Sequence, residues 1–178
     1  MQNNNILIAK KTLKELEKKS WKEISFKDLK VNKRISSIKN KTDLLVNINK
    51  YFDYLLKNNV SSIENSTSKD MLFEVLMARL DILNNYRSSV KNLINHFISY
   101  PYESIKFIPN FLETIIQIAT FSNIKINGVP GIPKIKIIFF LYLLILYSWK
   151  NDETESLEKT MTNLDKYLTY IEKFVKIS

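Results

Sequence analysis

The segment SKDMLFEVLMARLDILN, residues Ser68–Asn84, carries the clearest indication of the fold. Its apolar residues recur every three or four positions, which is the spacing of an α-helix. They form two rows instead of one: Met71, Val75, Ala78 and Ile82 in the first, and Leu72, Leu76, Leu80 and Leu83 in the second. A helix that is apolar on two sides has to be covered on both of them. The segment therefore predicts the central helix of an all-α bundle.

The segments on either side show the same helical period. Toward the C-terminus we expect helices over about residues 88–98, 102–122, 134–150 and 153–176, with a kink or a break at Pro109. Toward the N-terminus, an amphipathic helix carries the apolar residues Ile6, Ala9, Leu13 and Leu16. A short helix is expected to begin at Phe26 with Ser25 as its N-cap, and a longer one to follow Thr42 as its N-cap. No segment requires a β-strand.

The composition excludes several classes of protein. The chain has 178 residues, with two glycines, one histidine and no cysteine. So few glycines argue against phosphate-binding loops and dinucleotide fingerprints, and the lack of cysteine excludes disulfides and thiolate metal sites. We therefore expect no metal, no cofactor and no enzymatic activity. The most apolar run, residues 137–147, is shorter than the about 20 residues that span a bilayer, which predicts a buried helix in a cytoplasmic protein.

The positive charge is concentrated at the start of the chain. The formal net charge is +9, and residues 1–50 hold 13 Lys or Arg against 5 acidic residues, a net charge of +8. Such an excess favours a polyanionic partner. We therefore divide the chain into a basic head, residues 1–50, and an apolar helical body, residues 51–178.

Within the head, one stretch has the density of cations expected of a protein that neutralises phosphates. The cations of this basic stretch are Lys27, Lys30, Lys33, Arg34, Lys39 and Lys41. We interpret them as contacts to duplex DNA. An anionic membrane surface and an ordinary solvated face remain the two alternatives.

The body carries many aromatic and methionine side chains on its most apolar helices. We expect an apolar ligand, a small molecule or a lipid, in a cavity between helices. Its predicted lining residues are Phe73, Met77, Leu80, Phe111, Ile115 and Phe139. The alternative is a solid core in which the same side chains pack without a void.

The last helix predicts a homodimer. Its apolar residues are spaced alternately four and three apart, as in a coiled-coil seam. The predicted interface residues are Leu157, Met161, Leu164, Leu168 and Ile171. Because the preceding helix is apolar on nearly all sides, two such helices from each of two subunits are expected to form a four-helix bundle. The alternative is that the seam packs inside one subunit.

Several motifs resemble the TetR family of transcriptional regulators. The opening ILIAKKTLKELEKKSWKEISFKDL, residues 6–29, is similar to the TetR-type first helix and the turn into the second. KTDLL, residues 41–45, resembles the start of their fourth helix. LFEVLMARLDILNNYR, residues 72–87, and WKNDETESLEKTMTNLDKYL, residues 149–168, resemble a subgroup whose body architecture is shared with the lipid-binding accessory proteins of ubiquinone biosynthesis.

The resemblance implies a TetR-like fold with a short helix-turn-helix-like head and a helical-bundle body. It implies a homodimeric DNA-binding regulator, with an apolar ligand as its expected effector and with Arg34, Ser36 and Ser37 as outward candidates for base contacts. The head is about six residues shorter than the usual TetR-type head and lacks its helix-turn-helix glycine. This departure favours the alternative function, a lipid- or isoprenoid-binding accessory protein of ubiquinone biosynthesis that does not read DNA.

Overall fold

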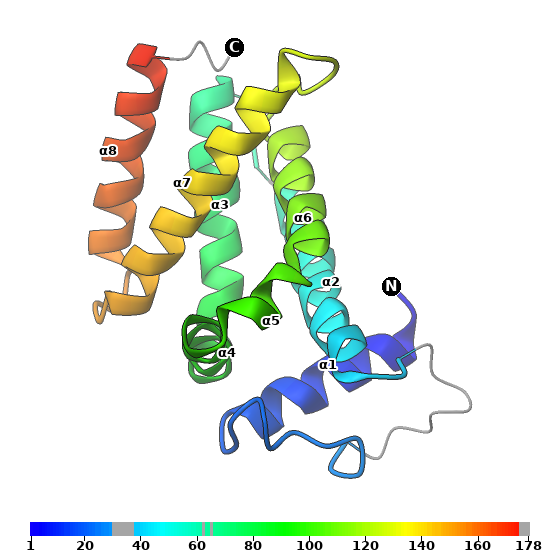
Figure 1. The fold of residues 1–178 in the computed structure, drawn as a ribbon. Coiled ribbons are helices and arrows are strands. Elements are labelled where there is room, and N and C mark those ends of the chain that lie inside the picture. Colours follow the sequence, from blue (N-terminus) through cyan, green and yellow to red (C-terminus); the bar gives the residue numbers. More distant parts are fainter. Residues whose placement is uncertain (30–37, 62, 65, 175–178) are drawn as a thin grey trace. The chain divides into compact units, whose positions relative to one another are not determined.

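The computed structural model describes residues 1–29, 38–61, 63–64 and 66–174. Within these ranges the chain forms eight helices and no strand (Figure 1). The helices are α1 (Asn3–Leu16), α2 (Lys41–Val60), α3 (Ser68–Asn84), α4 (Arg87–Ser99), α5 (Pro101–Ile105), α6 (Ile108–Phe121), α7 (Gly131–Asn151) and α8 (Glu158–Phe174). The predicted all-α class is confirmed, and α3 has the predicted bounds.

Two predictions near the N-terminus need correction. Asn40, not Thr42, caps α2, because its Oδ1 accepts a hydrogen bond of 2.9 Å from the Asp43 amide. Asp43 Oδ2 in turn accepts hydrogen bonds from the backbone amides of Lys39, at 2.7 Å, and Asn40, at 3.1 Å. This is the reciprocal pattern of a capping box. The residues from Phe26 to Leu29 form turns instead of the first residues of a helix, although Ser25 Oγ does accept the Lys27 amide.

Proline lies in the first turn of α5, α6 and α7. The predicted helix over residues 102–122 is two helices, and the break falls at Lys106 and Phe107, just before Pro109. Pro109 is the second residue of α6, where its missing N–H costs no helical hydrogen bond. For the same reason α7 contains Pro133 in its first turn and begins at Gly131, three residues earlier than predicted.

A turn delays α8 until Glu158, five residues after its predicted start. The Asp152 carboxylate holds this turn. Its Oδ1 accepts hydrogen bonds from the amide and the hydroxyl of Thr154, at 3.0 and 2.6 Å. Its Oδ2 accepts hydrogen bonds from the amide and the hydroxyl of Thr160, at 2.7 and 2.8 Å. Leu157, the residue before α8, takes the left-handed conformation with a φ of 55°.

We expect Asp152→Ala to destabilise the protein by about 2 kcal/mol at neutral pH. Burial alone raises the pKa of the Asp152 carboxyl, but the hydrogen bonds from Thr154 and Thr160 outweigh it and lower the pKa from 3.8 to about 2. A carboxyl whose pKa is lower in the folded state stabilises that state above its unfolded pKa. The contribution is therefore lost as the pH falls from about 4 to about 2.

Urea unfolding of Asp152→Ala at pH 7 and at pH 2 tests this expectation. The exposed neighbour Glu155 provides the control, since Glu155→Ala should change stability by less than about 0.5 kcal/mol. Equal losses for the two variants at pH 7 would contradict the role given to Asp152.

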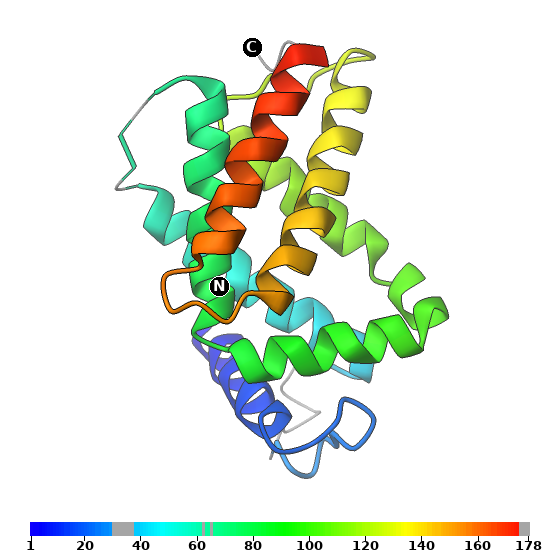
Figure 2. The same cartoon turned by 90° about the vertical axis from the view of Figure 1, so that its left-hand side faces the viewer.

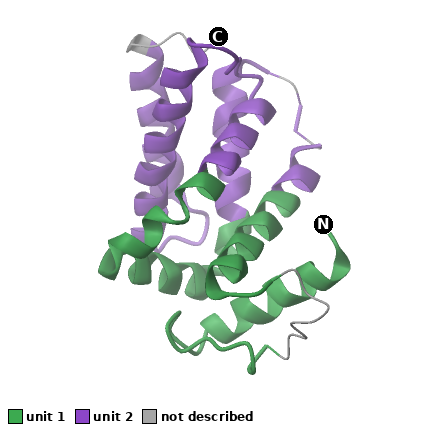
Figure 3. Cartoon of the chain, turned by 45° about the vertical axis from the view of Figure 1, so that its right-hand side comes forward, with its two compact units in different colours: residues 1–55, 82–111 green, residues 56–81, 112–178 purple. Residues whose placement is uncertain are grey.

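The described helices belong to two compact units, coloured separately in Figure 3. Unit 1 consists of residues 1–55 and 82–111, and unit 2 of residues 56–81 and 112–178. These structural units differ from the predicted head and body, because residues 82–111 join the N-terminal residues in unit 1. The functional division at residue 50 stays a prediction.

In unit 1, α4 lies against α1, as Figures 1 and 2 show. Side chains of α4 bind the main-chain carbonyls at the end of α1. Ser89 Oγ donates to the Leu13 carbonyl at 2.6 Å. Asn92 Nδ2 donates to the carbonyls of Leu16, at 3.0 Å, and Lys19, at 2.7 Å. These bonds satisfy carbonyls that have no partner within the helix itself, and they attach α4 to the N-terminal part of the chain.

In unit 2, α7 and α8 lie side by side (Figures 1 and 2). Side chains connect them to α3: Arg79 Nε donates to Tyr142 Oη at 3.2 Å, and Lys69 Nζ lies 2.9 Å from Glu172 Oε2 and 3.5 Å from Thr169 Oγ1. One face of α7 is buried, and it consists of Ile138, Leu141, Tyr142, Ile145 and Trp149.

The opposite face of α7 is apolar and exposed in the single chain, so the predicted buried helix is buried on one face only. This exposed α7 face consists of Ile132, Phe140, Leu143, Leu144 and Tyr147, with exposed fractions from 42% for Leu143 to 69% for Tyr147. The helix has 21 residues and a mean hydropathy of 1.7 over its most apolar 18, of which 28% are buried. By length and composition alone it could cross a membrane, a criterion that core helices of bundles also meet.

Gly131 begins α7 in a position that tolerates no side chain. A Cβ built there would lie 1.8 Å from the Ile126 carbonyl oxygen, which belongs to the backbone and cannot move aside cheaply. We expect Gly131→Ala to cost about 2 kcal/mol or more. Gly128, with a φ of 69° and an ordinary contact of 3.8 Å between a built Cβ and Pro130 Cδ, is the control, and its replacement by alanine should cost about 1 kcal/mol through its backbone conformation alone. Thermal unfolding of both variants gives the comparison, and equal melting temperatures would refute the clash.

Candidate nucleic-acid interface

The division into units sharpens the charge pattern. Unit 1 holds 16 Lys or Arg and 7 acidic residues, and unit 2 holds 11 of each. The whole formal charge of +9 therefore belongs to unit 1, and unit 2 is neutral. A polyanion approaching the protein is attracted to unit 1.

The basic stretch is described at its two ends. Lys27 and Lys39 are exposed to solvent, where a phosphate can approach them. Lys41 is half-buried, and its ammonium donates to the carbonyls of Trp21, at 3.1 Å, and Lys22, at 2.6 Å. Its side chain thus connects the start of α2 to the turn after α1. The other predicted contacts, Lys30, Lys33, Arg34, Ser36 and Ser37, lie outside the described residues.

Both ends of the basic stretch are held by local contacts. On the N-terminal side, Lys19 Nζ lies 3.1 Å from Asp28 Oδ1 and 3.4 Å from Glu15 Oε2. The hydrogen bond between Lys19 and Asp28 lowers the pKa of Asp28 and raises the pKa of Lys19. These pairs are solvent-exposed and position the turn more than they stabilise the fold. On the C-terminal side, Ile38 is buried next to the Asn40–Asp43 cap.

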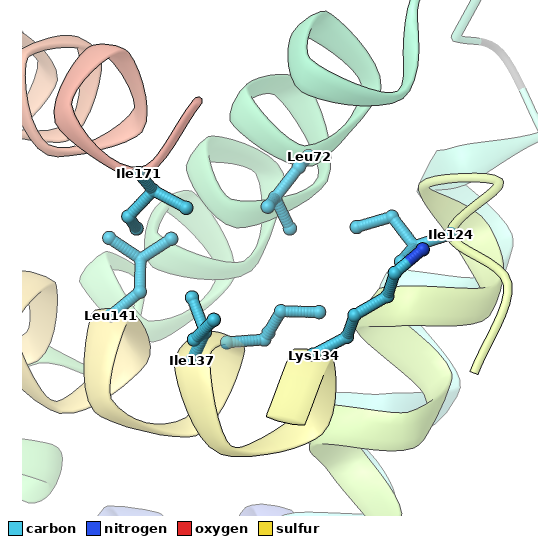
Figure 4. Close-up of a pocket in the computed structure, with 7 residues that line it drawn as sticks. Leu72, Ile124, Lys134, Ile137, Leu141 and Ile171 are labelled. Carbon is cyan, nitrogen blue, oxygen red and sulfur yellow. The ribbon is translucent and has the colours of Figure 1, made fainter. Parts of the chain in front are cut away.

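The pocket shown in Figure 4 lies in unit 2. Its walls come from α3, α7, α8 and the residue Ile124, and in the close-up the aliphatic side chains point toward one another. The lining residues are Leu72, Ile124, Lys134, Ile137, Ile138, Leu141 and Ile171. Its volume is about 10 Å³, which is close to the space needed by one water molecule.

None of the six predicted ligand residues lines this pocket. Leu80 and Ile115 are fully buried, while Phe73, Met77 and Phe139 are half-buried side chains of unit 2. Phe111 belongs to unit 1. A ligand cavity at the predicted residues stays a prediction. Of the predicted dimer residues, Ile171 lines the pocket instead.

The remaining predicted dimer residues divide into buried and exposed ones. Leu157, Leu164 and Leu168 are at most 2% exposed within the single chain, so they offer almost no surface to a second copy. Met161 is 42% exposed. The alternating spacing therefore reflects packing inside the subunit for these three leucines, while α7 exposes a larger apolar face than this seam does. The dimer itself stays a prediction.

The described residues hold no group of three or more His, Cys, Asp or Glu side chains that could bind a metal ion. The single histidine, His96, is buried, and its Nε2 lies 2.9 Å from Glu103 Oε2. It is a packed side chain of α4 with one carboxylate partner.

The architecture matches a solved structure over nearly its whole length. The chain superposes on the TetR transcriptional regulator from Nitrosomonas europaea ATCC 19718 with a TM-score of 0.75 and 15% sequence identity, covering 97% of this chain and 99% of that one. No family model matches the sequence, and no curated protein sequence does either. The protein therefore has a TetR-like all-α fold.

Proposed function

We propose that this protein is a TetR-like DNA-binding transcriptional regulator that works as a homodimer and responds to an apolar ligand. The observation that carries the proposal is the concentration of the entire charge of +9 in unit 1 of a TetR-like fold. Duplex DNA is the polyanion that such a fold is suited to bind, and phosphate contacts supply most of the non-specific affinity.

In this proposal, Lys27 and Lys39 contact phosphates together with Lys30, Lys33 and Arg34. Arg34, Ser36 and Ser37 are the candidates for base contacts. Lys41 has a different role, because its ammonium already binds two main-chain carbonyls. It positions the N-terminal end of α2 and contributes to DNA binding through the long-range field alone.

The proposed dimer forms through the exposed α7 face, with Met161 of α8 at its edge. Five large apolar side chains exposed on one helix make a surface that is unfavourable in water. A second copy covers it by a two-fold arrangement, since the same face then serves both subunits. The effector is proposed to bind at the predicted cavity residues of unit 2, and not in the pocket of Figure 4, which has room for about one water molecule.

The direct test is fluorescence anisotropy of a labelled random-sequence duplex at about 50 mM salt, where electrostatic binding is strong. Binding that weakens steeply with added salt supports a regulator, and selection from a random library then identifies the operator. No binding under these conditions would show that the regulator proposal is wrong.

The alternative function is a lipid- or isoprenoid-binding accessory protein of ubiquinone biosynthesis. The shortened head favours it, because a recognition helix needs roughly two turns to present side chains to the major groove. Its test is extraction of the purified protein with organic solvent. A co-purified isoprenoid or phospholipid, in a protein that fails to bind the duplex, supports the alternative.

A further inference from the structure

Unit 1 carries an exposed apolar surface where α4 ends and the chain continues through α5 into α6. Figure 2 shows this region at the far end of α4. We call it the 98–108 patch, and it consists of Ile98, Tyr100, Tyr102, Ile105 and Ile108, which are exposed by 64, 41, 73, 57 and 40%. Isolated exposed apolar residues are ordinary, but five within eleven residues of sequence are a concentration that marks a candidate contact surface.

Two lysines lie on the tyrosine rings of this patch. Lys22 Nζ is 3.5 Å from the centroid of the Tyr100 ring, and Lys106 Nζ is 5.6 Å from that of Tyr102. Both lysines are exposed, so the ammonium groups remain open to an anion from solvent.

The one carboxylate within the segment, Glu103, is bound to His96 at 2.9 Å. That hydrogen bond is the main reason why the pKa of Glu103 is lowered, and the charges of Lys22 and Lys106 add to it. Two lysines thus lie near one carboxylate, so the side chains of the patch carry an excess of positive charge.

We propose that the 98–108 patch binds the surface of an anionic lipid bilayer. Tyrosine is enriched at the level of lipid head groups, because its ring is apolar and its hydroxyl is polar. The three isoleucines gain from contact with acyl chains and gain nothing from a phosphate backbone, so lipid explains them where nucleic acid does not. The charge of +9 on unit 1 attracts the same anionic surface. This site goes beyond the proposed function and does not depend on DNA binding.

Co-sedimentation of the full chain with vesicles tests the proposal. Vesicles of phosphatidylcholine alone are compared with vesicles that contain about 30% phosphatidylserine, at about 100 mM salt. We expect binding to the anionic vesicles and at least tenfold weaker binding to the neutral ones. Tyr102→Trp provides a direct readout, because its emission should shift to the blue as the new side chain enters the interface.

Two variants divide the apolar from the electrostatic contribution. Tyr102→Ser/Ile105→Ser and Lys22→Ser/Lys106→Ser should each weaken binding to anionic vesicles at least tenfold, since one lysine near such a surface is worth about fivefold. Lys125→Ser/Lys136→Ser removes two exposed charges from unit 2 and should change binding less than threefold. Val129→Ser, at a side chain that is 80% exposed in unit 2, is the apolar control. Circular dichroism verifies that all variants keep their helices.

Three results would overturn the proposal. The first is no binding to anionic vesicles, in which case the 98–108 patch would be assigned to a protein partner instead of a membrane. The second is binding that the patch variants leave unchanged while Lys27→Glu/Lys39→Glu removes it, because the basic stretch would then be the membrane contact. The third is fluorescence emission of the Tyr102→Trp variant that does not shift when the protein binds.

Discussion

Replacing Lys27 and Lys39 with glutamate is expected to weaken duplex binding at about 50 mM salt by at least tenfold. Each lysine that neutralises a phosphate releases counterions, so the plot of log affinity against log salt should become shallower by about 1 for each lost contact. Both side chains are exposed, and the bonds of their backbone amides, to Ser25 Oγ and Asp43 Oδ2, do not involve the side chains. The double variant should therefore keep its fold.

The matched control for DNA binding is Lys125→Glu/Lys136→Glu. It changes the net charge of the chain by the same amount but places the new acidic groups on the neutral unit 2. We expect its salt dependence to keep the wild-type slope, with affinity reduced less than threefold. Equal losses in both double variants would mean that only the net charge matters and that the basic stretch is no specific interface.

The triple variant Lys30→Glu/Lys33→Glu/Arg34→Glu is expected to abolish measurable binding. It reverses three of the six cations of the basic stretch, including Arg34, the proposed base contact. Retained binding by the triple variant would move the DNA contact away from the basic stretch.

The second large effect concerns the exposed α7 face. We expect Phe140→Asp/Leu144→Asp to weaken dimerisation at least a hundredfold, because each carboxylate enters an apolar interface and two-fold symmetry places it there twice. Both side chains are at least half exposed in the single chain, so the change should leave the fold of unit 2 intact. Light scattering coupled to size exclusion at micromolar concentration measures the result as one chain mass instead of two.

Ile116→Asp serves as the control for the dimer. Ile116 lies on α6 and is 42% exposed, so the same kind of substitution is made away from α7. It should leave the mass of the dimer unchanged. A wild-type protein that elutes as one chain at micromolar concentration would refute the proposed dimer, whatever the variants do.

Much of the architecture follows from local sequence. The two apolar rows of Ser68–Asn84 predicted α3 with its observed bounds, because helical periodicity is set by residues three and four apart. The exact starts of α2 and α8 did not follow, since each depends on which polar side chain caps the helix. Asn40 and Asp152 accept hydrogen bonds from amides in the first turns of α2 and α8. By residue type alone, Thr42 was an equally plausible cap for α2 and Glu153 an equally plausible first residue for α8.

The sequence by itself determined the helical class, the position of the central helix and the excess of positive charge near the N-terminus. Only the tertiary structure decided which residues share a compact unit, since the bond from Ser89 to the Leu13 carbonyl joins positions 76 residues apart. It also decided which apolar residues remain exposed. Leu164 and Phe140 are both apolar helical residues, yet one is fully buried and the other is 61% exposed. Spacing along a helix indicates which residues share a face, but what covers that face depends on contacts with distant parts of the chain.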